Sequence, residues 1–234
     1  MATYNKRWHD VIWSSIGRVA SRSTFAAKTM EIAGHVSSYS MWRNQHGLGG
    51  KRFSTREQMW RSTAWPSLRE GRVTVFEFGV ASGDMTRMWL SALPNAELTW
   101  HGFDTFTGLP TDWTRGGIPF ARAGAFDAGG SPPAIDDSRV TWHAGRVEST
   151  LPGFSAPVRP GRICVLFDLD LYEPSRVVLD WLAPQLEPGD LLYFDEAYDP
   201  AHERRLLDEW FEHGVKVNAL GATGIALLLE YVGH

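Results

Sequence analysis

The feature that most constrains the fold is a buried apolar run that ends in a glycine turn. Residues 73–78 are rich in β-branched and aromatic side chains, which is typical of a buried strand. Gly79 and Gly83 interrupt this run, and residues 85–90 follow with a helical pattern. A strand, a glycine turn and a helix make the ligand-binding corner of a doubly wound α/β sheet, where glycines let the backbone approach a ligand and the helix N-terminus offers free N–H groups.

The residue types in this turn limit the class of ligand that it can bind. A dinucleotide fingerprint would need glycine at positions 77, 79 and 82, but the chain has Glu77, Gly79 and Ser82. The pattern acid-x-Gly-x-x-x-Gly instead resembles the S-adenosylmethionine (SAM) loop of class I methyltransferases. An acid at the first position repels a pyrophosphate but suits a ligand that carries an ammonium and a sulfonium. We place Glu77, Gly79 and Gly83 in a cofactor site, and an ordinary strand-to-helix turn is the alternative.

Composition excludes several classes of protein. The formal net charge is −4 and no basic block stands out, so we expect no nucleic-acid partner. No apolar run is long enough to cross a bilayer, and residues 1–10 are polar without the apolar centre of a signal peptide, which predicts a cytoplasmic protein without a membrane partner. The lone Cys164 lies in an apolar run and is expected to be an inert core thiol. The sequence leaves a homo-oligomer open.

The first 70 residues show no clear strand pattern. Residues 20–35 and 55–68 are predicted as helices, the second capped by Ser54 or Thr55, with a loop at 44–50 between them. We therefore expect a helical N-terminal cap over residues 1–70 and a ligand-binding domain over 71–234. The chain has 11 tryptophans, many of them before the glycine turn. They predict an aromatic-rich core, with the wall of a flat substrate site as the alternative.

From residue 72 onward, apolar runs alternate with helical patterns, which indicates parallel βαβ units. The last two apolar runs, at 215–220 and 224–231, predict an antiparallel hairpin. The expected fold is a Rossmann-like α/β domain with a mostly parallel seven-stranded sheet and a helical N-terminal segment. The other strands are expected near residues 73–79, 97–103, 139–143, 162–168 and 190–195, and the helices near 83–92, 146–151, 174–186 and 200–213.

Ligands of such sheets bind at the carboxyl ends of the strands. Asp104 ends the second predicted strand, at a spacing from the glycine turn that suits a carboxylate accepting the two hydroxyls of a ribose. We place the following Thr105 and Phe106 in the same cofactor site, and a helix cap or a solvated turn is the alternative for Asp104. The connection over residues 105–138 is unusually long and rich in aromatics and glycines, which favours a lid that closes over the cofactor.

Acidic side chains gather at the ends of the fourth and fifth predicted strands. Asp168 follows one of them, and Asp195 and Glu196 follow the next. Neighbouring strands lie about 4.8 Å apart, so these carboxylates are expected to share protons or to bind a hard cation such as Mg²⁺. Alternatively Asp168 acts alone as a general base, or the acids cap helices; Asp170 is the member expected to be structural. His202 is a second candidate base, although a lone histidine is more often a packing residue.

Four motifs in order resemble the macrocin O-methyltransferase family, SAM-dependent enzymes that methylate sugar hydroxyls of natural products. They are residues 76–83, 102–110, 168–172 and 194–196. The resemblance covers about residues 55 to 231, and it implies the class I methyltransferase fold. The chain departs from the family pattern at Leu166, where a histidine is common, and at Glu196, where a second aspartate is common.

The resemblance also implies roles for individual residues. Glu77, Gly79 and Asp104 would contact SAM. The acids at 168, 195 and 196 would hold Mg²⁺ beside a substrate hydroxyl. The expected function is O-methylation of a small-molecule acceptor, with Asp168 helping to remove the proton. Two alternatives stay open: intramolecular cyclisation of SAM that releases methylthioadenosine, and a catalytically inactive SAM-binding protein.

Overall fold

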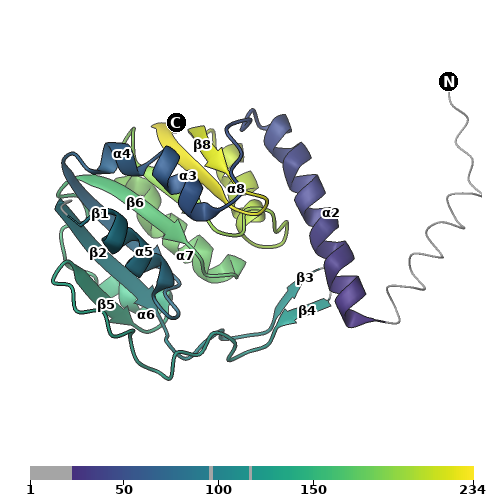
Figure 1. Ribbon diagram of the computed structural model, residues 1–234, viewed down its shortest axis with the longest axis horizontal. Coiled ribbons are helices and arrows are strands. Elements are labelled where there is room, and N and C mark those ends of the chain that lie inside the picture. The colour runs from purple at the N-terminus through teal and green to yellow at the C-terminus, as the bar shows by residue number, and fades with distance from the viewer. Residues whose placement is uncertain (1–22, 95–96, 116–117) are drawn as a thin grey trace, which may run out of the picture.

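Seven strands form one sheet in the order β5-β2-β1-β6-β7-β9-β8 (Figure 1). The computed structural model describes residues 23–94, 97–115 and 118–234. Only β9 runs antiparallel to its neighbours β7 and β8, so the predicted parallel sheet with an antiparallel C-terminal hairpin is confirmed. The strands of this sheet are β1 (Arg72–Phe78), β2 (Glu97–Asp104), β5 (Val140–Ala144), β6 (Arg162–Phe167), β7 (Leu191–Phe194), β8 (Lys216–Ala222) and β9 (Leu227–Gly233).

The register of the central strands brings their carboxyl ends to one edge. Phe78 at the end of β1 pairs with Phe103 of β2 and with Phe167 of β6. Phe167 in turn pairs with Phe194 at the end of β7. The residues that follow these strands therefore meet at the same edge, as the parallel arrangement predicts.

The helices lie where the sequence predicts them, with different ends. The first, predicted over 20–35, continues ten residues further because Tyr39 and Trp42 bury their rings against the sheet domain; residues 20–22 lie outside the described chain. The second is split near Thr63 into two short helices. The observed bounds are α2 (Thr24–Gln45), α3 (Arg56–Ser62), α4 (Trp65–Leu68), α5 (Asp84–Ala92), α6 (Val147–Thr150), α7 (Tyr172–Leu182) and α8 (Glu203–Glu212), with 3₁₀ turns at Leu151–Gly153 and Ala183–Gln185.

Side chains on alternate positions of the strands build two cores, one on each face of the sheet. One core packs against α2, α7 and α8. The other packs against α3, α4 and α5, and it contains Trp60, Trp65, Trp89 and Trp100. The Trp60 and Trp89 rings lie 4.6 Å apart in an edge-to-face arrangement. These four tryptophans are core residues, as the first of the two interpretations predicts.

The N-terminal segment is joined to the C-terminal hairpin. Arg52 forms an isolated parallel bridge with Ala222, and the Phe53 N–H donates to the Ala222 carbonyl at 2.9 Å. The Tyr39 hydroxyl donates to the Ala226 carbonyl at 3.0 Å. Figure 1 shows α2 running from the C-terminal strands at one end to the small hairpin β3 (Trp113–Arg115) and β4 (Ile118–Ala121) at the other. The sequence does not predict that hairpin.

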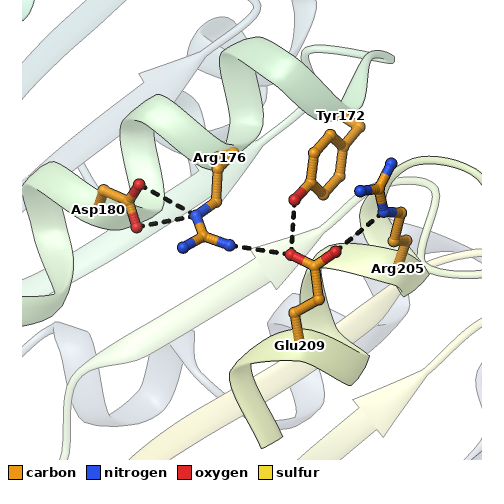
Figure 2. A network of polar contacts seen from close by, with 5 residues as sticks. All are labelled: Tyr172, Arg176, Asp180, Arg205 and Glu209. Atoms are coloured by element: carbon orange, nitrogen blue, oxygen red, sulfur yellow. Dashed lines mark hydrogen bonds and ion pairs between the residues drawn. The ribbon is translucent and has the colours of Figure 1, made fainter. Parts of the chain in front are cut away.

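A polar network fixes α7 against α8 (Figure 2). The Glu209 carboxylate on α8 accepts hydrogen bonds from the Tyr172 hydroxyl at 2.5 Å, from Arg176 at 2.9 Å and from Arg205 at 2.9 Å. Arg176 also pairs with Asp180 on its own helix. The loops that lead into α7 and α8 carry the predicted acidic residues, so this network also fixes their positions.

Replacing Glu209 by glutamine is expected to lower the free energy of unfolding by about 1 kcal/mol at pH 7, because the network loses its central charge. The Tyr172 hydroxyl and the two arginines lower the pKa of Glu209, so this stabilisation is present above the unfolded-state pKa and is lost as the pH falls. Urea unfolding at pH 7 and pH 3 measures both effects. Glu212→Gln, exposed on the same helix, is the matched control, and equal losses in the two variants would contradict the prediction.

Candidate active site

A cavity of about 840 Å³ opens at the carboxyl edge of the sheet. This volume lies in the range of about 300–1,000 Å³ that is usual for small-molecule sites. Its wall combines the end of β1 and its glycine turn, the end of β2, the long connection after β2, and the acidic residues after β6 and β7. The predicted site residues that line it are Glu77, Gly79, Asp104, Thr105, Asp168, Asp195 and Glu196.

Three predicted residues lie outside this lining. Gly83 caps the N-terminus of α5 with φ +80°. Phe106 is fully buried and contacts the Trp142 ring edge-to-face. His202 caps α8, and its Nδ1 accepts the Tyr172 N–H at 3.2 Å. The turn before α8 thus directs His202 toward the start of α7, where it makes an anchoring contact, and its role as a base stays a prediction.

Gly79 allows two strand ends to meet. Its φ is +92°, and a Cβ at this position would lie 1.8 Å from the carbonyl oxygen of Asp168. The Asp168 N–H donates to the Phe78 carbonyl at 2.8 Å, and the Gly79 N–H donates to Phe103 at 3.0 Å. The glycine therefore holds the acid at the end of β6 directly beside the turn after β1, a packing role that the sequence does not reveal.

Glu77 is buried at the cavity wall with one oxygen unpaired. Its Oε2 accepts hydrogen bonds from the Thr86 hydroxyl and from the Trp100 indole, the latter at 2.9 Å. Its Oε1 is buried and has no hydrogen-bond partner in the protein. Burial raises the pKa of Glu77 to about 8, and the nearby Asp104 adds to this effect against the two hydrogen bonds. A cationic group in the cavity would satisfy the unpaired oxygen and favour the carboxylate.

Asp104 anchors two loops at once. Its Oδ2 accepts the N–H groups of Val80 at 2.7 Å and Ala81 at 2.8 Å, and its Oδ1 accepts the Phe106 N–H at 2.8 Å. The carboxylate therefore ties the turn after β1 to the first turn of the long connection. Oδ2 thus accepts two N–H groups and Oδ1 only one, so Oδ1 keeps a lone pair with which the predicted contact with a ribose hydroxyl is compatible.

Asp168 and Asp195 lie at adjacent strand ends, as predicted. The Asp195 N–H donates to the Phe167 carbonyl at 3.0 Å. Burial, followed by the charges of Asp195, Asp170 and Glu196, raises the pKa of Asp168 well above its usual value. The backbone of Glu196 is fixed because its N–H donates to Oε2 of the buried Glu203 at 2.8 Å. The sequence analysis did not single out Glu203.

The arrangement of these acids does not fit the predicted Mg²⁺ site. Both oxygens of Asp195 are engaged, one by the Arg56 guanidinium and the other by the Tyr193 hydroxyl. Within the described part of the chain, no three acidic, histidine or cysteine side chains are arranged to hold a metal ion. A guanidinium already ion-paired with one of the proposed ligands would also repel a divalent cation.

The long connection forms the outer wall of the cavity, as a lid would. The hairpin β3–β4 presents Trp113 and Phe120 to the cavity, and Phe126 lines it further along. Lys28 of α2 donates to the Phe120 carbonyl at 3.1 Å and lies 5.3 Å from the centre of its ring. Aromatic side chains of the long connection, and not those of the described N-terminal segment, thus line the cavity beside the acids.

Known structures share this architecture. The calicheamicin methyltransferase CalS11 is 24% identical over 74% of this chain and 76% of its own, with a TM-score of 0.54. The chain has the class I methyltransferase fold. The O-methyltransferase NovP is 18% identical over 75% of this chain and 80% of its own, with a TM-score of 0.51. No protein-family model and no curated protein sequence matches the chain.

The described helices also bear on membrane association. None of those within residues 23–94, 97–115 and 118–234 combines the length and apolar character needed to cross a bilayer.

Proposed function

We propose that this protein is a SAM-dependent O-methyltransferase that acts on a hydroxyl of a small molecule. The observation that carries the proposal is the meeting of Glu77, Asp104 and Asp168 on one cavity at the carboxyl edge of the sheet. The unpaired buried oxygen of Glu77 would suit an ammonium group, and the carboxylate of Asp104 would suit a ribose. Asp168 would suit the hydroxyl of the molecule that accepts the methyl group. The fold shared with CalS11 and NovP supports this assignment.

Each of these residues would have a separate role, set by its position in the cavity. Glu77 would bind the cofactor's ammonium and Asp104 its ribose hydroxyls, beside the backbone of residues 79–82. SAM supplies an activated methyl group on a sulfonium. Asp168 accepts the proton from the acceptor hydroxyl, and the lid excludes water and orients the acceptor against Trp113 and Phe120.

The acceptor class follows from the size and lining of the cavity. Its aromatic outer wall and acidic floor suit a molecule with both ring surface and hydroxyls, such as a sugar or a natural-product intermediate. One structure of CalS11 is described as a TDP-rhamnose 3′-O-methyltransferase in calicheamicin biosynthesis, which favours the same class.

Mass spectrometry of the products from SAM tests this function directly. The purified protein is incubated with SAM, with and without pools of hydroxylated sugars and natural products. S-adenosylhomocysteine together with an acceptor one methyl group heavier is the expected result. Methylthioadenosine formed without an acceptor would instead show cyclisation of SAM, and binding without turnover of any pool would favour an inactive SAM-binding protein.

Replacing Asp104 by alanine is expected to weaken SAM binding by about 1–3 kcal/mol, because it removes both the ribose acceptor and the anchor of the turn after β1. The loss of three backbone partners is also expected to lower the free energy of unfolding. Calorimetry and urea unfolding measure the two effects. Asp127→Ala, which removes only a cap on the Gly129 N–H, is the control; unchanged SAM affinity in Asp104→Ala would remove this residue from the site.

A further inference from the structure

We propose that Arg56 is the resident cation of the acidic cluster, which comprises Asp168, Asp170, Asp195 and Glu196, and that its guanidinium takes the place that a divalent metal ion would otherwise occupy. This inference rests on the proposed function, because it concerns how the same site is charged and positioned. It assigns a charged residue of the site to the N-terminal segment, whose tryptophans the sequence analysis considered only as core residues or as a substrate wall.

Arg56 belongs to a helix that is fixed in position, α3. It is the first residue of α3, and the preceding Thr55 caps this helix by accepting the Gln58 N–H at 3.1 Å. Met59 and Trp60 of the same helix are fully buried in one of the two cores. The helix is therefore fixed on the sheet, and its first side chain lines the cavity beside the acids.

The contacts of Arg56 join a half-exposed guanidinium to a buried carboxylate. Its Nη2 pairs with Oδ2 of Asp195, whose side chain is only 6% exposed. The Tyr193 hydroxyl donates to the other oxygen of Asp195 and so fixes the carboxylate in the orientation that the guanidinium needs. Arg56 Nε is itself buried. Asp195 is thus satisfied by two protein donors, so a metal ion would have to share both of its oxygens with them.

The charges around the guanidinium of Arg56 indicate its role. Burial acts to lower the pKa of Arg56, but the charges of Asp195, Asp168 and Glu196 outweigh it, so the pKa is raised and the charged form is favoured. The four acids of the cluster line the same cavity as Arg56, so this end of the cavity would repel an anionic acceptor group. Arg56 therefore serves the cluster and not an acceptor phosphate or carboxylate. It is a positioning residue that holds Asp195 in place and offsets negative charge beside Asp168.

Manganese binding tests the proposal without relying on activity. Mn²⁺ is titrated into the wild type and into Arg56→Ala, with free Mn²⁺ followed by electron paramagnetic resonance. The wild type is expected to show no stoichiometric site, whereas Arg56→Ala exposes the carboxylates and binds Mn²⁺ about tenfold or more tightly than the wild type. Adding Asp195→Asn to Arg56→Ala should abolish the gained binding. Arg61→Ala, on the exposed face of the same helix, should behave as the wild type.

Two results would overturn the proposal. One is a stoichiometric Mn²⁺ site in the wild type that Asp195→Asn abolishes. The other is an Arg56→Ala variant that is folded yet binds Mn²⁺ no better than the wild type. If the alanine variant fails to fold, Arg56→Gln gives the same readout with a longer side chain. SAM calorimetry on the same samples separates the two claims, because a wild type that binds no SAM contradicts the proposed function whatever its Mn²⁺ result.

Discussion

Asp168→Asn is expected to lower kcat by about 10²- to 10⁴-fold, because it removes the group that takes the proton from the acceptor hydroxyl. The asparagine side chain has the same shape, and the backbone contact of this residue with Phe78 is unaffected. SAM affinity should therefore change little. The loss should appear in kcat and not in the dissociation constant of SAM, which separates proton removal from cofactor binding.

Steady-state kinetics with the identified acceptor, together with SAM calorimetry, measure this split. Asp170→Asn is the matched control, since Asp170 lies two residues further along the same turn. Its φ is +62°, a conformation that asparagine adopts readily. Its loss of kcat should be much smaller. Equal losses in the two variants would mean that the turn, and not a proton acceptor at Asp168, sets the rate.

Glu77→Gln is expected to remove a pH dependence from folding stability. Burial raises the pKa of Glu77 to about 8 from an ordinary value of 4.5, so the folded protein without cofactor holds a proton that the unfolded chain releases. The stabilisation from this proton is complete below the unfolded-state pKa and is lost as the pH rises through 8. Between pH 5.5 and 8 the wild type should lose about 3 kcal/mol that the glutamine variant retains.

Urea unfolding of both proteins at the two pH values measures this difference. Glu97→Gln, at an exposed ion pair with Arg72, is the control and should follow the wild type. A variant whose stability changes with pH as steeply as that of the wild type would show that Glu77 is ionised throughout.

The same substitution should also affect the affinity for the cofactor. Glutamine cannot form an ion pair with an ammonium, so Glu77→Gln should weaken SAM binding by about 1.5–3 kcal/mol. In the wild type, a bound ammonium favours the carboxylate, so binding at pH 7 should release a proton from Glu77. Calorimetry in buffers with different ionisation enthalpies detects that release. An equal proton balance in wild type and variant would place the ammonium elsewhere.

Local patterns in the sequence were sufficient to predict the sheet and most of the cavity wall. Parallel strands fix where their carboxyl ends lie, so Glu77, Asp104 and Asp168 could be brought together without knowing any side-chain contact. Gly79 was found as a glycine of the turn, although its need for close packing against Asp168 was not visible. The sheet could be predicted because the apolar periodicity that marks each strand is a property of a short segment. The common edge of the strand ends then follows from their parallel arrangement.

The remaining features depend on contacts between distant segments. Arg56 and Asp195 are 139 positions apart, and nothing around Arg56 in the sequence marks it as a partner of the acids. The extra length of α2 comes from the burial of Tyr39 and Trp42, which overrides the weak helix propensity of the intervening serines. His202 was chosen for its proximity in sequence to the acids, whereas the turn before α8 directs it to Tyr172.

The bridge between Arg52 and Ala222 has a consequence for how the chain is made. On the ribosome the N-terminal helices emerge first, but the strand on which residues 51–53 dock is synthesised well after them. Arg56 can reach its place only after that late docking, since α3 follows directly. The newly made polypeptide must therefore complete the hairpin of β8 and β9 before the guanidinium can join the acidic residues, so assembly of this site is expected to be a late step of folding.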